Sequence, residues 1–239
     1  GCGVSLIGLA GMDNAGKELT RAIAQIPQIL STPILCPNRP TTVKTRYLSA
    51  GQQMLRVDRE ITDLPNEEET EKLFEQASLL MADCDILILS DYAKGCLGPA
   101  LNRRLIKAAH EQNIQVIIDP KSADFSDYRG ADLLTPNLAE LRRATGLTQD
   151  SLSAIEQAAR DILKECDIRQ MLVTLSARGM MLVTPDSACH IPARPCEVFD
   201  VSGAGDTVIA LLASGIITEL GMAPSAHLAN LGASLVVAK

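Results

Sequence analysis

The chain has 239 residues, of which 46% are hydrophobic and 21% charged, and only 3% aromatic with no Trp. This predicts a globular protein with a large, mainly aliphatic core. The formal net charge of −7 argues against a general nucleic-acid binder, because phosphate backbones require a basic surface.

The first third of the chain predicts a strand, a helix and an exposed hairpin. Val4 to Leu9 is apolar enough for a buried strand, and a helix is expected to follow up to about Ile26. The alternating segments TTVKTRYL and QQMLRVDR flank a Gly-containing link and predict a hairpin over residues 41–59. The next segment, NEEETEKLFEQASLLMA, predicts a helix with acids crowded into its first turns.

Strands and helices alternate through the rest of the chain. Continuous apolar strands are expected at DILILSD, IQVIIDPK, ADLLTPN and QMLVTLS, and a β-meander at GMMLVTP and ACHIPARP. Such strands are typical of a parallel sheet covered on both faces, so we predict an α/β fold. Helices are expected at 99–112, from about Leu138, at 151–166, at 204–219 and at 224–237.

Polar or small residues stand at five successive strand ends. In open α/β sheets, ligands bind beyond the carboxyl ends of the strands. Strand ends are loops and loops are usually polar, which accounts for the polarity of these positions. A shared ligand site explains better why so many charged and amide side chains fall on one edge of the sheet. The residues in question are Lys94, Asp119, Lys121, Asn137, Glu140 and Asp206.

The segment VFDVSGAGDTVIA points to an anion. Gly203, Ala204 and Gly205 have almost no side chains, so their amides and the start of the following helix can approach a phosphate closely. Asp206 can then take a proton from a substrate hydroxyl. An acid in a first turn also stabilises a helix by itself, so both interpretations stay open. A Walker A loop is excluded, because G-x-x-x-x-G-K-[ST] is absent.

Cysteine and histidine spacing argues against a disulfide framework or a zinc site. The seven cysteines include no C-x-x-C, and the three histidines lie far apart. We expect reduced thiols, a cytoplasmic location and no membrane partner, since no apolar run approaches the length of a membrane span. The chain starts and stops within apolar elements, so we expect a piece of a longer protein.

Several separated motifs resemble the ribokinase-like (PfkB) carbohydrate kinases. DVSGAGDT is similar to that family's carboxy-terminal signature, TPNLAE to its N-x-x-E motif, and VTLSARGM to its nucleotide-binding strand and turn. RPTTVKTRYLSAGQQMLRVD, SDYAKG, DPK and YRGADLLTPNLAEL narrow the resemblance to heptose 7-phosphate kinase domains of bifunctional enzymes that also carry an adenylyltransferase domain. The resemblance implies one kinase domain over residues 1–239, with a three-layer sandwich, a mostly parallel central sheet and a β lid at 39–60.

The resemblance also implies a reaction. ATP with Mg²⁺ would phosphorylate the anomeric hydroxyl of D-glycero-D-manno-heptose 7-phosphate to the 1,7-bisphosphate, in ADP-heptose and lipopolysaccharide precursor synthesis. Asp206 would be the base, with the anion hole at Gly203, Ala204 and Gly205. Asp200 would shape its loop or a monovalent-cation site, and a simple capping acid is the alternative for this residue. The nucleotide and its metal would be held by Asn137, Glu140 (through metal-bound water), Thr174, Ser176 and Gly179.

The hairpin would be the family's lid over the sugar, and it carries an excess of basic residues. Such a face suits a phosphorylated substrate, although an exposed edge strand also uses Lys and Arg to prevent aggregation. Lys94 and Lys121 either neutralise phosphate or form surface ion pairs. The expected substrate-binding residues are Lys44, Arg46, Gln53, Arg56, Asp58, Lys94 and Lys121.

The chain also departs from the family. A first strand with a sugar-binding acid and a G-G-A/N segment are missing before Gly1, as are the end of the kinase domain and the adenylyltransferase domain. Two rivals stay open: another sugar or nucleoside kinase of this fold, and an inactive nucleotide- or sugar-phosphate-binding fragment. Family members often pair through the lid, so a homodimer is expected.

Overall fold

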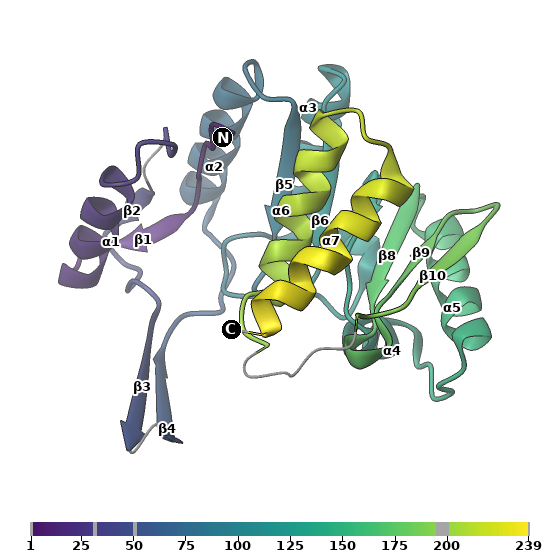
Figure 1. Ribbon diagram of the computed structural model, residues 1–239. Coiled ribbons are helices and arrows are strands. Elements are labelled where there is room, and N and C mark those ends of the chain that lie inside the picture. The colour runs from purple at the N-terminus through teal and green to yellow at the C-terminus, as the bar shows by residue number, and fades with distance from the viewer. Residues whose placement is uncertain (1, 31–32, 50–51, 195–200, 239) are drawn as a thin grey trace. The chain divides into compact units, whose positions relative to one another are not determined.

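The structure is a computed structural model that describes residues 2–30, 33–49, 52–194 and 201–238 (Figure 1). The chain forms two compact units. The first holds residues 1–82 and 93–101, and the second holds residues 83–92 and 102–239. Among the described residues, no helix combines the length and the apolar character that crossing a membrane requires.

The second unit is built on a six-stranded sheet in the order β10-β9-β8-β7-β6-β5. Strands β5 to β8 run parallel, while β9 and β10 continue the edge in antiparallel pairing. The predicted parallel strands and the β-meander are therefore confirmed. The strands are β5 (Ile86–Ser90), β6 (Gln115–Asp119), β7 (Leu133–Leu134), β8 (Gln170–Thr174), β9 (Met180–Val183) and β10 (Ala188–Ile191).

Helices cover both faces of this sheet, as Figure 1 shows. Leu212 of α6 and Ala229 of α7 are fully buried in a core with Leu133 and Leu172 of the sheet. These two carboxy-terminal helices are apolar along most of their length, which is what a covered sheet face requires. The helices are α3 (Pro99–Glu111), α4 (Leu138–Thr145), α5 (Leu152–Glu165), α6 (Ala204–Ile217) and α7 (Met222–Val237), with short 3₁₀ turns η1 (Phe125–Tyr128) and η2 (Ser176–Arg178).

The first unit holds the hairpin. Strands β3 and β4 pair antiparallel, as predicted, with a bulge near Tyr47. Asp13 anchors the base of the hairpin: its carboxylate accepts from Gly16 N at 2.9 Å, from Thr41 Oγ1 at 2.7 Å and from Arg59 at 2.8 Å. The bond from Thr41 is the main reason that the pKa of Asp13 falls to about 2. The elements are β1 (Leu9–Gly11), α1 (Asn14–Ala24), β2 (Ile34–Cys36), β3 (Val43–Ser49), β4 (Gln52–Arg59) and α2 (Glu67–Met81).

The predicted buried strand from Val4 to Leu9 is wrong. The strand runs over Leu9–Gly11 and pairs parallel with β2, while Val4 forms only an isolated bridge with Ile29 and is 47% exposed. Pro27 and Pro33 flank the partner segment and have no N–H, so neither residue can donate a ladder hydrogen bond.

Candidate active site

Four parallel strands bring their carboxyl ends to one edge of the sheet. Ser90 lies opposite Asp119, and the backbone bridge between Asn137 and Thr174 continues the edge beyond β7 and β8. The predicted gathering of polar strand ends is therefore confirmed for these four strands. The fifth expected strand end, with Asp200, lies outside the described residues.

Asn137 and Glu140 form a reciprocal cap at the start of α4. Asn137 Oδ1 accepts the Glu140 N–H at 2.9 Å, and Glu140 Oε2 accepts the Asn137 N–H at 2.9 Å. Each side chain thus satisfies a backbone donor that a helix start leaves open. The first unit repeats this arrangement at α2, where Asn66 and Glu69 form the same box.

Lys121 reaches Glu140 from the segment after β6. Its Nζ lies 2.5 Å from Glu140 Oε1, and the Glu140 side chain is 4% exposed against 44% for Lys121. The two oxygens of a buried carboxylate are thereby engaged, one by an ammonium group and one by the helix start. Lys121 is thus an ion-pair partner of Glu140.

Asp119 is the functional candidate that sequence reasoning left without a role. It ends β6 and is half-buried, and loss of hydration together with Glu140 raises its pKa to about 6. Asp206 and Asp91 add to the rise, whereas Lys121 opposes it. Strongly shifted acids with a stated charge environment are candidates for functional sites. Negative charge therefore concentrates at the end of β6.

Replacing Asp119 with Asn is expected to stabilise the protein at pH 8 but not at pH 4. The folded-state pKa lies above the ordinary value of 3.8, so ionised Asp119 opposes folding above about pH 6, and this cost vanishes as pH falls below 3.8. A shift of this size corresponds to about 2–3 kcal/mol. Urea unfolding at both pH values measures the difference.

Asp124→Asn is the matched control with the opposite sign. The Ser126 hydroxyl and backbone N–H lower the pKa of Asp124, so its removal should reduce stability at pH 8. If Asp119→Asn also reduced stability at pH 8, Asp119 would not lie in a repulsive environment.

The start of α6 exposes backbone rather than side chains. Gly203 precedes the helix in a left-handed conformation, with φ at 77°, and as the N-cap residue it has no side chain to cap the helix. Among the described residues, a Cβ atom added at Gly203 or Gly205 would meet nothing within 4 Å. The anion hole at this helix start remains a prediction with which the available space is compatible.

Asp206 lies in the first turn of α6 and is exposed. Its Oδ1 accepts a hydrogen bond of 2.8 Å from the Tyr92 hydroxyl, at the end of the β5 segment. The residues are 114 positions apart, and no local pattern in the sequence indicates this contact. Asp206 is thus a carboxylate beside an open, uncapped helix start.

The three residues expected to line the nucleotide differ in accessibility. Thr174 is half-buried at the end of β8, and Ser176 is exposed with a φ of 53°. Gly179 is buried, and a Cβ there would stand 2.0 Å from the Ile191 carbonyl oxygen. Gly179 therefore permits close packing of the turn against the chain after β10.

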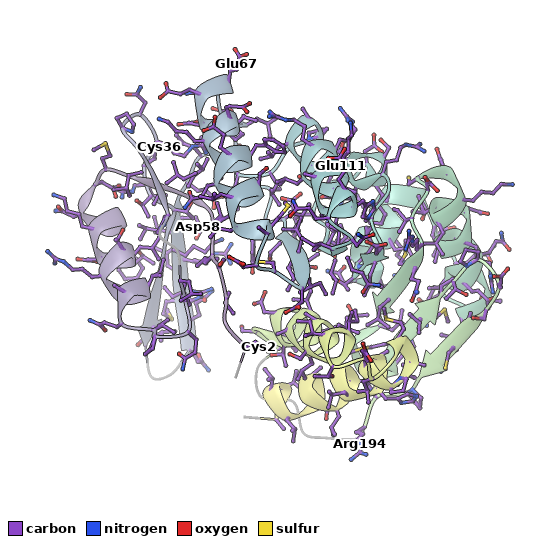
Figure 2. All side chains as sticks on the ribbon, turned by 90° about the horizontal axis from the view of Figure 1, so that it is seen from above. Cys2, Cys36, Asp58, Glu67, Glu111 and Arg194 are labelled. Atoms are coloured by element: carbon purple, nitrogen blue, oxygen red, sulfur yellow. The ribbon has the colours of Figure 1, made fainter. Side chains whose placement is uncertain are left out.

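The hairpin places its charged residues on one face. In the β3–β4 register, Lys44 lies opposite Asp58 and Arg46 lies opposite Arg56. Lys44 Nζ lies 3.4 Å from Asp58, and Arg56 Nε lies 3.0 Å from it (Asp58 is labelled in Figure 2). The bulge puts Gln53 opposite Leu48, so Gln53 joins the same face.

Arg46 and Arg56 form a like-charge cross-strand pair. Like charges directly opposite each other destabilise a hairpin. In the described part of the chain Arg46 makes no ion pair, while Arg56 shares Asp58 with Lys44. Lys94 belongs to the same unit, where its ammonium pairs with Glu60. The basic excess is therefore partly neutralised, and Arg46 carries the unpaired charge.

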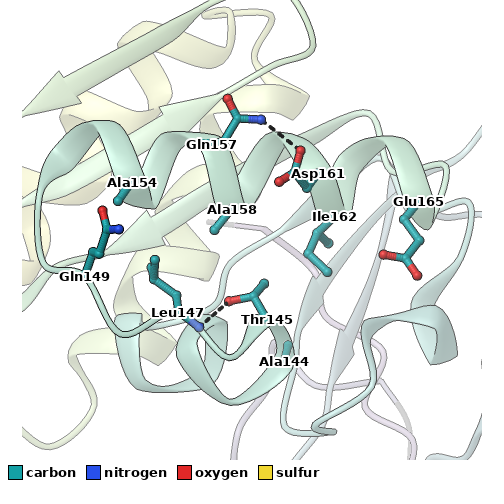
Figure 3. Close-up of a pocket in the computed structure, with 10 residues that line it drawn as sticks. All are labelled: Ala144, Thr145, Leu147, Gln149, Ala154, Gln157, Ala158, Asp161, Ile162 and Glu165. Carbon is teal, nitrogen blue, oxygen red and sulfur yellow. Dashed lines mark hydrogen bonds between the residues drawn. The ribbon is translucent and has the colours of Figure 1, made fainter.

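None of the predicted site residues lines the cavity in Figure 3. It measures about 500 Å³ and lies between α4 and α5, where its lining includes Thr145, Asp161 and Glu165. Two carboxylates and no cationic side chain line it, so it would repel a phosphorylated ligand. The edge of the sheet, although open, is the better candidate.

No preformed metal cage exists among the described residues, since none of their His, Cys, Asp and Glu side chains gather in groups of three or more suited to a metal. Mg²⁺ in nucleotide sites keeps several waters and binds through one or two carboxylates plus substrate phosphates. The carboxylates of Asp119 and Glu140, in a region whose charge raises the pKa of Asp119, fit that kind of ion.

The whole chain is similar in sequence to known carbohydrate kinases. The profile of pfkB family carbohydrate kinases matches residues 1–239. Bifunctional protein HldE of Acidiphilium cryptum is 42% identical over 235 residues, and that of Caulobacter vibrioides is 44% identical over 236 residues. Each match covers 98% of this chain and 48% of the relative. The chain spans about half the length of the curated relatives it matches.

Solved structures share the fold. Phosphofructokinase-2 from Escherichia coli in complex with potassium has a TM-score of 0.83 at 18% identity, over 99% of this chain and 76% of that one. Ribokinase from Arabidopsis thaliana complexed with ribose and ATP has a TM-score of 0.73 at 22% identity, over 98% of this chain and 76% of that one. The predicted ribokinase-like α/β fold is confirmed.

Proposed function

Because this chain belongs to the pfkB family of carbohydrate kinases, we propose that it serves phosphoryl transfer from ATP to the anomeric hydroxyl of D-glycero-D-manno-heptose 7-phosphate. The observation that carries the proposal is the start of α6. There an exposed carboxylate, Asp206, adjoins an uncapped helix end with open space at Gly203 and Gly205. A base and an anion hole in one turn suit in-line transfer, which needs positioning and charge stabilisation.

Asp206 takes the proton of the acceptor hydroxyl. The hydroxyl oxygen then forms a bond to the γ-phosphorus, while the bond from that phosphorus to the oxygen bridging to the β-phosphate breaks, and ADP leaves. The N–H groups of Gly205 and its neighbours Ala204 and Gly203 face the transferred group, where negative charge is held in the transition state. Thr174 and Ser176 line the nucleotide, and Gly179 shapes their turn.

Mg²⁺ would be held by Glu140 through water and by Asp119. When bound, the ion neutralises charge on the ATP phosphates. Lys121 would then leave or share Glu140 and add a second positive charge near the phosphates. Asn137 fixes Glu140 through the reciprocal cap at α4. A monovalent cation near Asp200 is a further proposal, consistent with the potassium complex of phosphofructokinase-2.

The charged face of the hairpin supports the proposal that the substrate is a phosphorylated sugar. A phosphate between Arg46 and Arg56 would relieve the repulsion of this cross-strand pair and receive two charge-assisted hydrogen bonds. Lys44, Gln53 and Asp58 share that face and would contact the same substrate, with Lys94 held nearby through Glu60. The similarity of the motifs to heptose 7-phosphate kinase domains supports the identity of the sugar.

The opposite face of the hairpin supports the proposal that two copies of the chain pair through it. Tyr47 lies opposite Leu55, and these side chains are 54% and 55% exposed. Two such apolar faces, from two copies, would cover each other. The longer relatives, which are named bifunctional, support a second domain in the whole protein, and we propose an adenylyltransferase.

Phosphoryl transfer to heptose 7-phosphate tests the proposal. ³¹P NMR of the purified protein with Mg²⁺, ATP and heptose 7-phosphate should show a new anomeric phosphate and ADP. Ribose and adenosine are the competing acceptors, because neither carries a phosphate and a ribokinase of this fold was solved with ribose and ATP. Turnover of either one without turnover of heptose 7-phosphate would reject the substrate assignment. No turnover of any acceptor would favour a binding fragment.

A further inference from the structure

Tyr92 stands where the end of β5 meets the start of α6. Its hydroxyl donates a 2.8 Å hydrogen bond to Asp206 Oδ1, and the side chain is 55% exposed. The phenol is therefore reachable from solvent at the same place as the carboxylate. None of the motifs considered above gives this tyrosine a role.

A buried tether fixes the backbone that carries Tyr92. The neighbouring Asp91 is buried, its Oδ2 accepts the Tyr128 hydroxyl at 2.5 Å, and its N–H donates to the Asp119 carbonyl oxygen at 3.0 Å. Tyr128 is fully buried and also accepts the N–H groups of Lys121 and Ser122. The end of β5 is thereby held to the segment after β6.

The backbone turns sharply immediately after Tyr92. Ala93 has a φ of 51°, a left-handed conformation that is unfavourable for an alanine. Strained residues of this kind cluster at functional sites. The tether before Tyr92 and the strained turn after it both fix where the phenol lies.

We infer that Tyr92 is a positioning residue for Asp206. Its hydrogen bond occupies Oδ1 and holds the carboxylate in one orientation, which leaves Oδ2 free to accept the proton of the acceptor hydroxyl. Burial and the bond to Asp206 raise the pKa of Tyr92, and the side chain of Ser90 partly offsets this rise. This inference rests on the proposed function of Asp206.

The first test needs no enzymatic activity. The chain has three tyrosines, so ¹³Cζ-tyrosine labelling gives three NMR signals, which Tyr→Phe variants assign. Burial and then the bond to Asp206 raise the pKa of Tyr92, while the charge of Asp119 acts more weakly through space. Asp206→Asn should therefore lower the midpoint of Tyr92, whereas Asp119→Asn, the matched control, should lower it much less. Equal shifts in the two variants, or no shift, would overturn the hydrogen bond.

The second test uses Tyr92→Phe, which keeps the ring at an exposed position and should fold normally. We expect kcat to fall about tenfold while KM for Mg–ATP stays the same, because the base loses its orientation but the nucleotide contacts are intact. An unchanged kcat would overturn the positioning role. A protein that phosphorylates no sugar would instead reject the proposed function, and the NMR titration would still report the bond.

Discussion

Asp206→Asn is expected to lower kcat by about 10³-fold with little change in the KM for ATP or sugar. Asn keeps the shape of the side chain but cannot take the proton of the acceptor hydroxyl, and a general base contributes about 10²–10⁴-fold. Steady-state kinetics of ADP release, with thermal unfolding as a check on the fold, measure the effect.

Glu67→Gln is the matched control for this variant. Glu67 also lies in the first turn of a helix, α2, and is exposed (labelled in Figure 2). Both variants remove a favourable charge at a helix start, worth about 0.3–1 kcal/mol. If the two lowered kcat equally, Asp206 would only stabilise its helix and the base would lie elsewhere.

The double variant Arg46→Ala, Arg56→Ala is expected to raise KM for the phosphorylated sugar by about 10²-fold. Each hydrogen bond from Arg to a phosphate contributes about 1.5–3 kcal/mol. The KM for ATP should stay the same. Assays with saturating ATP and varied heptose 7-phosphate measure the change.

The free energy of unfolding distinguishes a phosphate-binding role of Arg46 and Arg56 from a role in stabilising the fold. Because Arg46 and Arg56 repel each other, Arg46→Ala should leave the free energy of unfolding unchanged or slightly higher. Arg59→Ala is the control: Arg59 lies on the other face of β4 and binds Asp13, so it should lower stability without changing KM for the sugar. An unchanged sugar KM in the double variant would reject the phosphate site.

Local sequence patterns predicted most of the second unit. Continuous apolar segments such as ILILS and QVIID form central parallel strands, where both faces are covered and no alternation is needed. The strand β2 has only three residues, too few to show a pattern in the sequence, and the first strand pairs with it only over Leu9–Gly11. Short segments form strands only when their tertiary neighbours supply the pairing.

The sequence predicted which polar residues lie at the strand ends, but it did not predict the contacts between them. The strand-end rule found Asp119 and Lys121, because it depends only on where apolar runs stop. The bond between Tyr92 and Asp206 and the charge environment of Asp119 arise from residues far apart in sequence. Neither periodicity nor spacing encodes such contacts.

The two reciprocal caps change how this sequence should be compared with its relatives. Asn137 and Glu140 begin α4 with the same contacts that Asn66 and Glu69 use to begin α2, where no ligand is expected. A relative that had lost catalysis would still need the N-x-x-E pair to begin its helix. Asp206 caps no backbone group among the described residues, and its charge contributes only about 0.3–1 kcal/mol to the helix start. If Asp206 is the base, as proposed, the acid at position 206 would distinguish an active relative from an inactive one better than the N-x-x-E pair would.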